Sequence, residues 1–359
     1  MKACGCCGRD NDDELAHCRE CGTEFPVLPV QADARTGPRL VDLDRLEGAF
    51  DFDEGFSRPD WKVIRPAVES AANPEDRRDV WDDVVEQWLT WLKGELGGGY
   101  RLIRSRHFIL LADIETEAAH RLLNSAENAM SSIRSSLNGV VWHGLDGSQV
   151  LLFFSEEDDY YQYISGFYPG GTHPKSGGIY IFAGYPHIAL HFDGEVNAAQ
   201  TVVHELTHHA LNGLVIPLWL NEGMAVVLQK IIGGRTSFSA WQELIDRHHK
   251  FWNEAQIQHF WAGTSFHEPG DAVELSYSLA EILVSMLVKD RDAFLAFIRS
   301  AQPAGAGQTA ALDCLESCLG DAVGTFLGEG NWRPQRKAIK ACWEAERAAT
   351  KKSDEAGVA

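Results

Sequence analysis

The sequence predicts an α+β fold, in which a small mixed β-sheet is followed by a largely helical half. Segments rich in β-branched and aromatic residues occur in the first half of the 359-residue chain, whereas segments after residue 195 show helical spacing of apolar residues. Apolar residues make up 45% of the chain, which is enough for a globular core. Five cysteines within the first 21 residues predict a separate small module at the N-terminus.

This N-terminal module carries two Cys-x-x-Cys pairs, Cys4 with Cys7 and Cys18 with Cys21, which are separated by ten residues. A glycine follows each pair and permits the tight turn that directs backbone N–H groups at thiolate sulfur. Four thiolates close a tetrahedral zinc site without an open position, so this zinc would be structural, and the arrangement resembles a zinc ribbon. Alternative ligands for the same site are Cys6 and His17.

The charge of the chain bears on its partners. The net charge of −20 repels phosphate backbones, so nucleic-acid binding is not expected. Residues 1–25 hold three basic and six acidic residues, which favours a protein partner for the N-terminal module. No apolar run reaches the ~18 residues that cross a bilayer, and no signal core is recognised, so we expect a cytoplasmic protein without a membrane partner.

The predicted elements follow from local patterns. Asn73-Pro74-Glu75 is typical of a helix start, apolar residues then recur at helical spacing, and Gly97 ends the helix. β-formers predict strands over 100–111, 149–154 and 178–182. Helical spacing predicts the remaining helices over 115–137, 156–165, 196–214, 219–231, 240–253, 276–288, 291–300, 310–319 and 335–350.

The helix predicted over 196–214 contains His204-Glu205-x-x-His208. Residues four apart share a helix face, so the two imidazoles can bind one metal ion, with Glu205 beside that face. Zinc lowers the pKa of a water that it binds from ~15.7 towards ~7, and Glu205 could take the proton as the water attacks a carbonyl. The alternative is a polar helix face without a metal. Apolar neighbours of the motif instead favour a buried helix, where these polar side chains need partners.

A catalytic zinc needs a third protein ligand, and the sequence offers Glu222. The metzincin pattern requires glycine and histidine where this chain has Leu211 and Leu214. Glu222 lies 14 residues after His208, near the start of the next predicted helix, and Gly213 and Pro217 allow the chain to reverse between the two helices. The alternative for Glu222 is a helix start with an acid in its first turn.

Other candidate ligands are set aside. His209 points about 100° away from His208 on an ideal helix. His187 and His191 precede the motif helix and are expected in a loop, at the surface or lining a cleft. Cys314 and Cys318 are four apart on a predicted helix and are expected to be buried free thiols, because no second pair is near.

The two motifs together, His204-Glu205-x-x-His208 and Asn221-Glu222-Gly223, resemble those of the gluzincin metallopeptidases, and most closely the peptidase MA-like branch. The resemblance covers roughly residues 100–289. It implies a thermolysin-like catalytic core in which His204, His208 and Glu222 bind zinc and Glu205 is the general base.

The same resemblance implies two further features. Tyr277, in the helix predicted over 276–288, would help to hold the developing oxyanion; the alternative is a tyrosine of the core. The strand over 178–182 would be an edge strand that pairs with extended substrate.

The sequence therefore predicts a zinc-dependent peptidase that acts on a peptide or protein substrate and holds one catalytic and one structural zinc. Four regions are expected: the zinc module (1–25), a linker and irregular region (26–72), the catalytic domain (73–302), and C-terminal helices with a disordered tail (303–359). The alternative is a scaffold that binds peptides without cutting them. An intact Glu205 favours the enzyme, because a binding protein has no need of this base.

Overall fold

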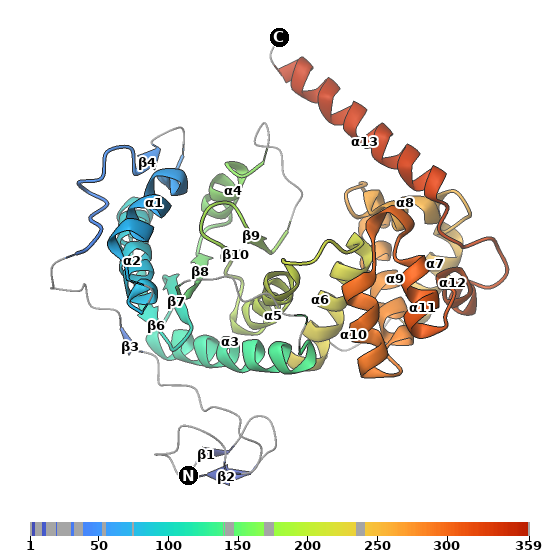
Figure 1. Cartoon of the computed structure of the whole chain (residues 1–359), viewed down its shortest axis with the longest axis horizontal. Helices are drawn as coiled ribbons and strands as arrows, with labels where there is room; N and C mark the ends of the chain where they lie inside the picture. Colours follow the sequence, from blue (N-terminus) through green and yellow to red (C-terminus); the bar gives the residue numbers. More distant parts are fainter. Residues whose placement is uncertain are drawn as a thin grey trace. The chain divides into compact units, whose positions relative to one another are not determined.

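The computed structural model describes residues 2–3, 9–11, 19, 30–31, 39–51, 55–73, 75–138, 140, 147–168, 176–234 and 241–357. The chain forms two compact units, one made of residues 1–135 and 143–206 and the other of 136–142 and 207–359. Figure 1 labels their elements. The first unit holds a mixed sheet with helices and the second is helical, so the predicted α+β class is confirmed.

The sheet of the first unit has the strand order β3-β6-β7-β8-β10-β9. Strands β7, β8 and β10 are parallel, and the other pairs are antiparallel. The bounds are β3 Val30–Gln31, β6 Arg101–Arg104, β7 Phe108–Ala112, β8 Gln149–Phe154, β9 Gly178–Ile181 and β10 His187–His191. Short pairs outside this sheet are β1 Lys2–Ala3 with β2 Asp10–Asn11, and β4 Phe50–Asp51 with β5 Arg58–Pro59.

Alternate residues of the central strands enter a core on one face of the sheet. Ile109, Leu152 and Ala189 pack there with buried side chains of α1, α2 and α4. These helices span Trp61–Ala71, Arg77–Leu96 and Glu157–Ser165, and α1 packs beside α2 (Figure 1). Neighbouring residues such as Leu151 and Leu190 are equally buried on the opposite face. Both faces of the sheet are therefore covered, which explains why its strands are continuous apolar runs.

Two long helices of the first unit are α3 (Thr116–Ser136) and α5 (Glu195–Leu211). Both Nε and Nη2 of Arg121 in α3 donate to the carboxylate of Glu195 in the first turn of α5, at 2.8 and 2.7 Å. The division between the two units falls within α5, after Leu206, so the last turn of this continuous helix belongs to the second unit.

The second unit is built from helices around an aromatic core. The rings of Trp219, Phe260 and Trp261 contact one another, and the indole N–H of Trp219 donates to the carbonyl of Ala306 at 3.0 Å. Its helices are α6 Leu218–Ile232, α7 Trp241–Phe251, α8 Gln256–Ala262, α9 Asp271–Leu287, α10 Arg291–Ser300, α11 Gln308–Leu315, α12 Leu319–Leu327 and α13 Arg336–Gly357, with short 3₁₀ turns at Thr264–Phe266 and Pro303–Gly305.

Several predicted elements are confirmed to within a few residues, and others need correction. The strand predicted over 100–111 is two strands, β6 and β7, joined by a turn at 105–107. The region 26–72, predicted to be linker and irregular, contains α1, and Val41, Leu43 and Ala49 enter the core. Helix α13 continues to Gly357, through most of the tail predicted as disordered. The predicted domain boundaries stay predictions.

The elements that the sequence did not predict include β10, α8 and α12 as well. Strand β10 corrects the expectation that His187 and His191 lie in a loop. In the part of the chain that the structure describes, no helix combines the length and the apolar character needed to cross a membrane.

Candidate metal centre

Helix α5 places the first motif. Its turn from Val202 to Leu206 is buried on one side, which anchors the helix, while His204 and His208 are half-buried on a neighbouring side. Because the helix is continuous from residue 195 to residue 211, its own geometry keeps these two imidazoles one turn apart. The Glu205 side chain lies beside them and is 7% exposed, so its carboxylate is shielded from bulk water.

Helix α6 brings the second motif back towards α5. The chain leaves α5 at Leu211 and enters α6 after Pro217, as the predicted reversal requires. Glu222 is the fifth residue of α6, and the first turn of this helix contains no acid. The alternative that Glu222 is an acid of the first turn is therefore wrong.

The side chains of α6 meet those of α5 at His208. The ring Nδ1 of His208 lies 2.8 Å from Oδ1 of Asn221. An amide oxygen accepts, so Nδ1 carries the proton and Nε2 keeps its lone pair. Nε2 faces Oε2 of Glu222 at 3.4 Å. Asn221 therefore fixes the tautomer in which the nitrogen facing Glu222 can bind a cation, a role that its position in the sequence does not indicate.

His204, His208 and Glu222 each offer one ligand atom, and these atoms all lie within 4.8 Å of one another. Two imidazoles and one carboxylate are the donor set of many catalytic zinc sites, which leave the fourth position open. Ligand atoms about 2.0–2.1 Å from a tetrahedral zinc lie about 3.3–3.4 Å apart, whereas an N–H···O hydrogen bond is usually about 2.7–3.2 Å long. The distance of 3.4 Å between His208 and Glu222 matches a shared cation better than a hydrogen bond.

Two tyrosines of the first unit lie within the electrostatic influence of Glu205. Burial, and then the charge of Glu205, raise the pKa of Tyr168 above its ordinary value. Burial also raises the pKa of Tyr160, with a further contribution from Glu205. The phenol oxygen of Tyr160 lies 2.9 Å from Oγ of Ser176, just before β9. The segment that leads into β9 is therefore held near the candidate base. Tyr168 was not singled out from the sequence, because the proximity arises only in the fold.

Strand β9 approaches α5 one turn before His204. A Cβ atom built on Gly178 would come within 2.4 Å of Cγ2 of Thr201, so only glycine permits this close contact. Strand β9 is the last strand of the sheet. Among the described strands it is therefore an edge strand, as predicted, and it lies against the helix that carries the motif.

Tyr277 lies on α9 and is half-buried, with its ring 5.2 Å from that of Phe266 in a T-shaped contact. Helix α9 packs against α6 where a Cβ on Gly223 would come within 2.6 Å of the carbonyl oxygen of Ala280. The glycine of the Asn-Glu-Gly motif thus allows α9 to approach the helix that carries Glu222. The catalytic role of Tyr277 stays a prediction.

The remaining candidates fall into two groups. The structural zinc ligands Cys4, Cys7, Cys18 and Cys21, with the alternatives Cys6 and His17, lie outside the described residues. Cys314 and Cys318 are free, as predicted, but half-buried rather than fully buried.

His187 is not a cleft or surface residue but part of the core, with 1% exposure. Its Nδ1 donates to the carbonyl of Tyr185 at 2.8 Å, and its Nε2 accepts from the hydroxyl of Tyr163 at 2.8 Å. Both ring nitrogens are thus satisfied in the neutral form. Burial lowers the pKa of His187 to about 4.

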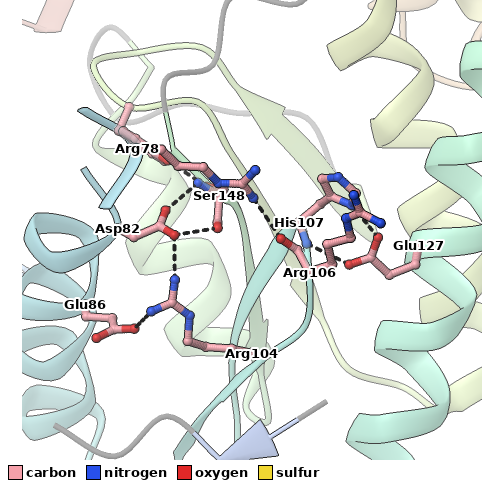
Figure 2. Close-up of polar contacts among 9 residues, drawn as sticks. Arg78, Asp82, Glu86, Arg104, Arg106, His107, Glu127 and Ser148 are labelled. Carbon is pink, nitrogen blue, oxygen red and sulfur yellow. Dashed lines mark hydrogen bonds and ion pairs between the residues drawn. The ribbon is translucent and has the colours of Figure 1, made fainter. Parts of the chain in front are cut away.

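A second polar cluster lies in the first unit, at the turn between β6 and β7 (Figure 2). Asp82 of α2 accepts from the backbone N–H of Ser148 at 2.6 Å and pairs with Arg104 at 2.5 Å. The same guanidinium also contacts Glu86. Buried charges that lack partners are costly, so these pairs fix α2, β6 and the entry to β8 relative to one another.

Glu127 of α3 completes this cluster from the other side (Figure 2). Its carboxylate accepts from Ser105 at 2.6 Å and from the backbone N–H and ring Nδ1 of His107, each at 2.7 Å. Burial raises the pKa of Glu127, but these hydrogen bonds outweigh it and hold the pKa below its ordinary value. The cluster lies where the parallel strands β7 and β8 begin, whereas ligands of such sheets bind at the carboxyl ends. We therefore assign it to stability.

The comparisons with known proteins add no family to this description, because no family model matches the chain and no curated protein matches it.

Proposed function

We propose that the protein is a zinc-dependent hydrolase of peptide bonds, with His204, His208 and Glu222 as the protein ligands of the metal. The observation that carries the proposal is the convergence of these three side chains, with Asn221 setting the tautomer of His208. Zinc at this donor set supplies a Lewis acid and makes a water molecule easier to deprotonate.

Glu205 is the proposed general base. It is a buried carboxylate one residue after His204 and three residues before His208, so it lies on the same helix beside two of the proposed ligands. It takes a proton from the attacking water as the water oxygen bonds to the carbonyl carbon. When the C–N bond breaks, the proton passes to the leaving amine, so atoms and charges balance.

Substrate would lie along β9, as an added strand on the sheet. The edge position of β9 and its contact with α5 support this. Tyr277, in the helix packed on α6, is the proposed donor to the developing oxyanion.

The three described thiols, Cys314, Cys318 and Cys342, are all free, which supports a reducing compartment such as the cytoplasm.

A second zinc, held by Cys4, Cys7, Cys18 and Cys21, remains part of the proposal on the strength of the paired spacing alone. Such a module would serve to contact a protein partner.

The test combines metal analysis with cleavage of a peptide library. We expect about two zinc ions per chain in the wild type, and about one in His204→Ala. Glu205→Gln should keep its metal and lose cleavage, since an amide cannot accept the proton. Equal turnover by the wild type and Glu205→Gln would rule out the assigned base. A single zinc that is lost in Cys4→Ser and kept in His204→Ala would instead indicate the peptide-binding scaffold.

A further inference from the structure

The outer edge of β9 has a defined set of backbone groups. The backbone N–H of His191 donates to the carbonyl of Gly177 at 3.2 Å, and this pair lies next to β9. Opposite residues in antiparallel strands alternate between pairs that exchange hydrogen bonds and pairs that do not. The odd-numbered residues of β9 therefore turn their backbone groups towards β10. Gly178 and Tyr180 turn theirs to the outer edge of the sheet.

The side chains of β9 are also divided between two faces. Ile181 is buried in the core formed with α1 and α2, and Ile179 packs against that core. Since successive side chains alternate, Gly178, Tyr180 and Phe182 project to the opposite face, where Gly178 touches α5. Tyr180 is half-buried, and Phe182, directly after the strand, is 55% exposed. Two aromatic rings thus stand at alternate positions on the face that carries the motif helix.

The direction of β9 relates these rings to the candidate base. Gly178, the first residue of β9, lies against Thr201, one turn before Glu205 on α5. The strand therefore starts beside the motif helix, and Tyr180 and Phe182 follow after this contact. A peptide added antiparallel to β9 runs the opposite way, towards this contact. Its residues beside Tyr180 and Phe182 would precede the bond that is cut.

We propose that Tyr180 and Phe182 select substrates with apolar or aromatic side chains at two alternate positions N-terminal to the cleaved bond. Cross-strand neighbours on one face lie about 4.5–5.5 Å apart at Cβ, so each of these substrate side chains packs on one ring. An exposed aromatic ring at a sheet edge gains from such contact, because both apolar surfaces leave water. This inference names the substrate class of the proposed peptidase and rests on that function.

The experiment uses the full chain and has two arms. In the first, a peptide library is cut by the wild type, by Phe182→Ser and by Tyr180→Thr, which keeps a β-former in the strand. The control is Leu312→Ser, because Leu312 is similarly exposed, at 50%, on α11. In the second arm, an array of the same peptides measures binding to Glu205→Gln alone and combined with Phe182→Ser.

We expect the wild type to prefer apolar residues at two positions, spaced two residues apart, before the cleaved bond. Each β9 variant should lower the ratio of kcat/KM for apolar over polar residues at one of these positions by about tenfold. The same ratio for Leu312→Ser should equal that of the wild type.

The two arms separate this inference from the proposed function. Metal-dependent cleavage without a preference at these positions, or a preference that survives both β9 variants, overturns the inference and leaves the peptidase intact. An array preference that is lost with Phe182→Ser, in a protein that cuts nothing, refutes the peptidase and supports only the binding of apolar peptides at β9. If the protein shows no cleavage and no selective binding, both the inference and the proposed peptidase function are overturned.

Discussion

Acidification should destabilise the protein through a histidine that is buried in its neutral form. His187 has 1% exposure, donates from Nδ1 and accepts at Nε2. An added proton on Nε2 would displace the bond from Tyr163 and place a charge among the rings of Trp88 and Phe167. The folded protein therefore resists protonation of this residue, while the unfolded chain does not.

The magnitude follows from the two pKa values. Burial lowers the pKa of His187 to about 4 in the folded protein, against an ordinary value of 6.5. Because the folded pKa is depressed, the stability contribution is fully present above pH 6.5, falls as the pH drops, and is gone below about pH 4. At about pH 5 the neutral fraction of His187 is about 30-fold larger in the folded protein than in the unfolded chain. This ratio corresponds to a loss of about 2 kcal/mol in the free energy of unfolding, relative to about pH 7.5.

Urea unfolding of the wild type and of His187→Gln, at about pH 7.5 and about pH 5, measures this loss. The variant should be less stable at the higher pH, but it should lose about 2 kcal/mol less than the wild type on acidification. His120→Gln, in α3 of the same unit, controls for the removal of a histidine as such. If the wild type and His187→Gln lose the same free energy between the two pH values, the neutral buried state inferred for His187 is wrong.

Three further outcomes are expected. Asn221→Leu should weaken zinc binding about 10–100-fold in a chelator competition titration, whereas Asn221→Asp, which keeps an acceptor for Nδ1, should bind nearly as tightly; equal weakening in both would refute the orienting role. Gly223→Ala should destabilise the protein by about 1–3 kcal/mol in urea unfolding and also weaken zinc binding, because its Cβ meets a backbone oxygen of α9; an unchanged midpoint would contradict the close packing. Asp82→Ala should cost about 3–5 kcal/mol of stability by leaving Arg104 without one of its partners, and a loss below about 1 kcal/mol would show that water replaces the carboxylate.

Local patterns were sufficient to predict much of the chain around the candidate site. The periodicity of apolar residues predicts α5 and α6 to within three residues, because each helix buries one stripe and ends at glycine or proline. The four-residue spacing of His204 and His208 fixes their shared face in the same way. The short reversal between the two helices predicts that Glu222 faces the two histidines.

Other features depend on contacts between distant residues. The turn at 105–107 splits a continuous run of β-formers, and Glu127, some 20 residues later, holds it in place. Strand β10 lies in the interior of the sheet and is buried on both faces, so apolar and polar residues do not alternate along it. Because it also carries two histidines, its sequence resembles that of a loop. The role of Asn221 depends on the approach of α6 to α5, which no local pattern encodes.

The brevity of β9 affects how the protein behaves in concentrated solution. Strand β9 has four residues, and the chain turns soon after it at Gly184, whose φ of 74° is in the left-handed region. A Cβ there would come within 1.7 Å of the ring of Trp61, so the turn requires glycine. An edge of four residues offers few ladder bonds with which to template self-association between copies. Glycine at position 184 thus helps to keep this edge of the sheet short.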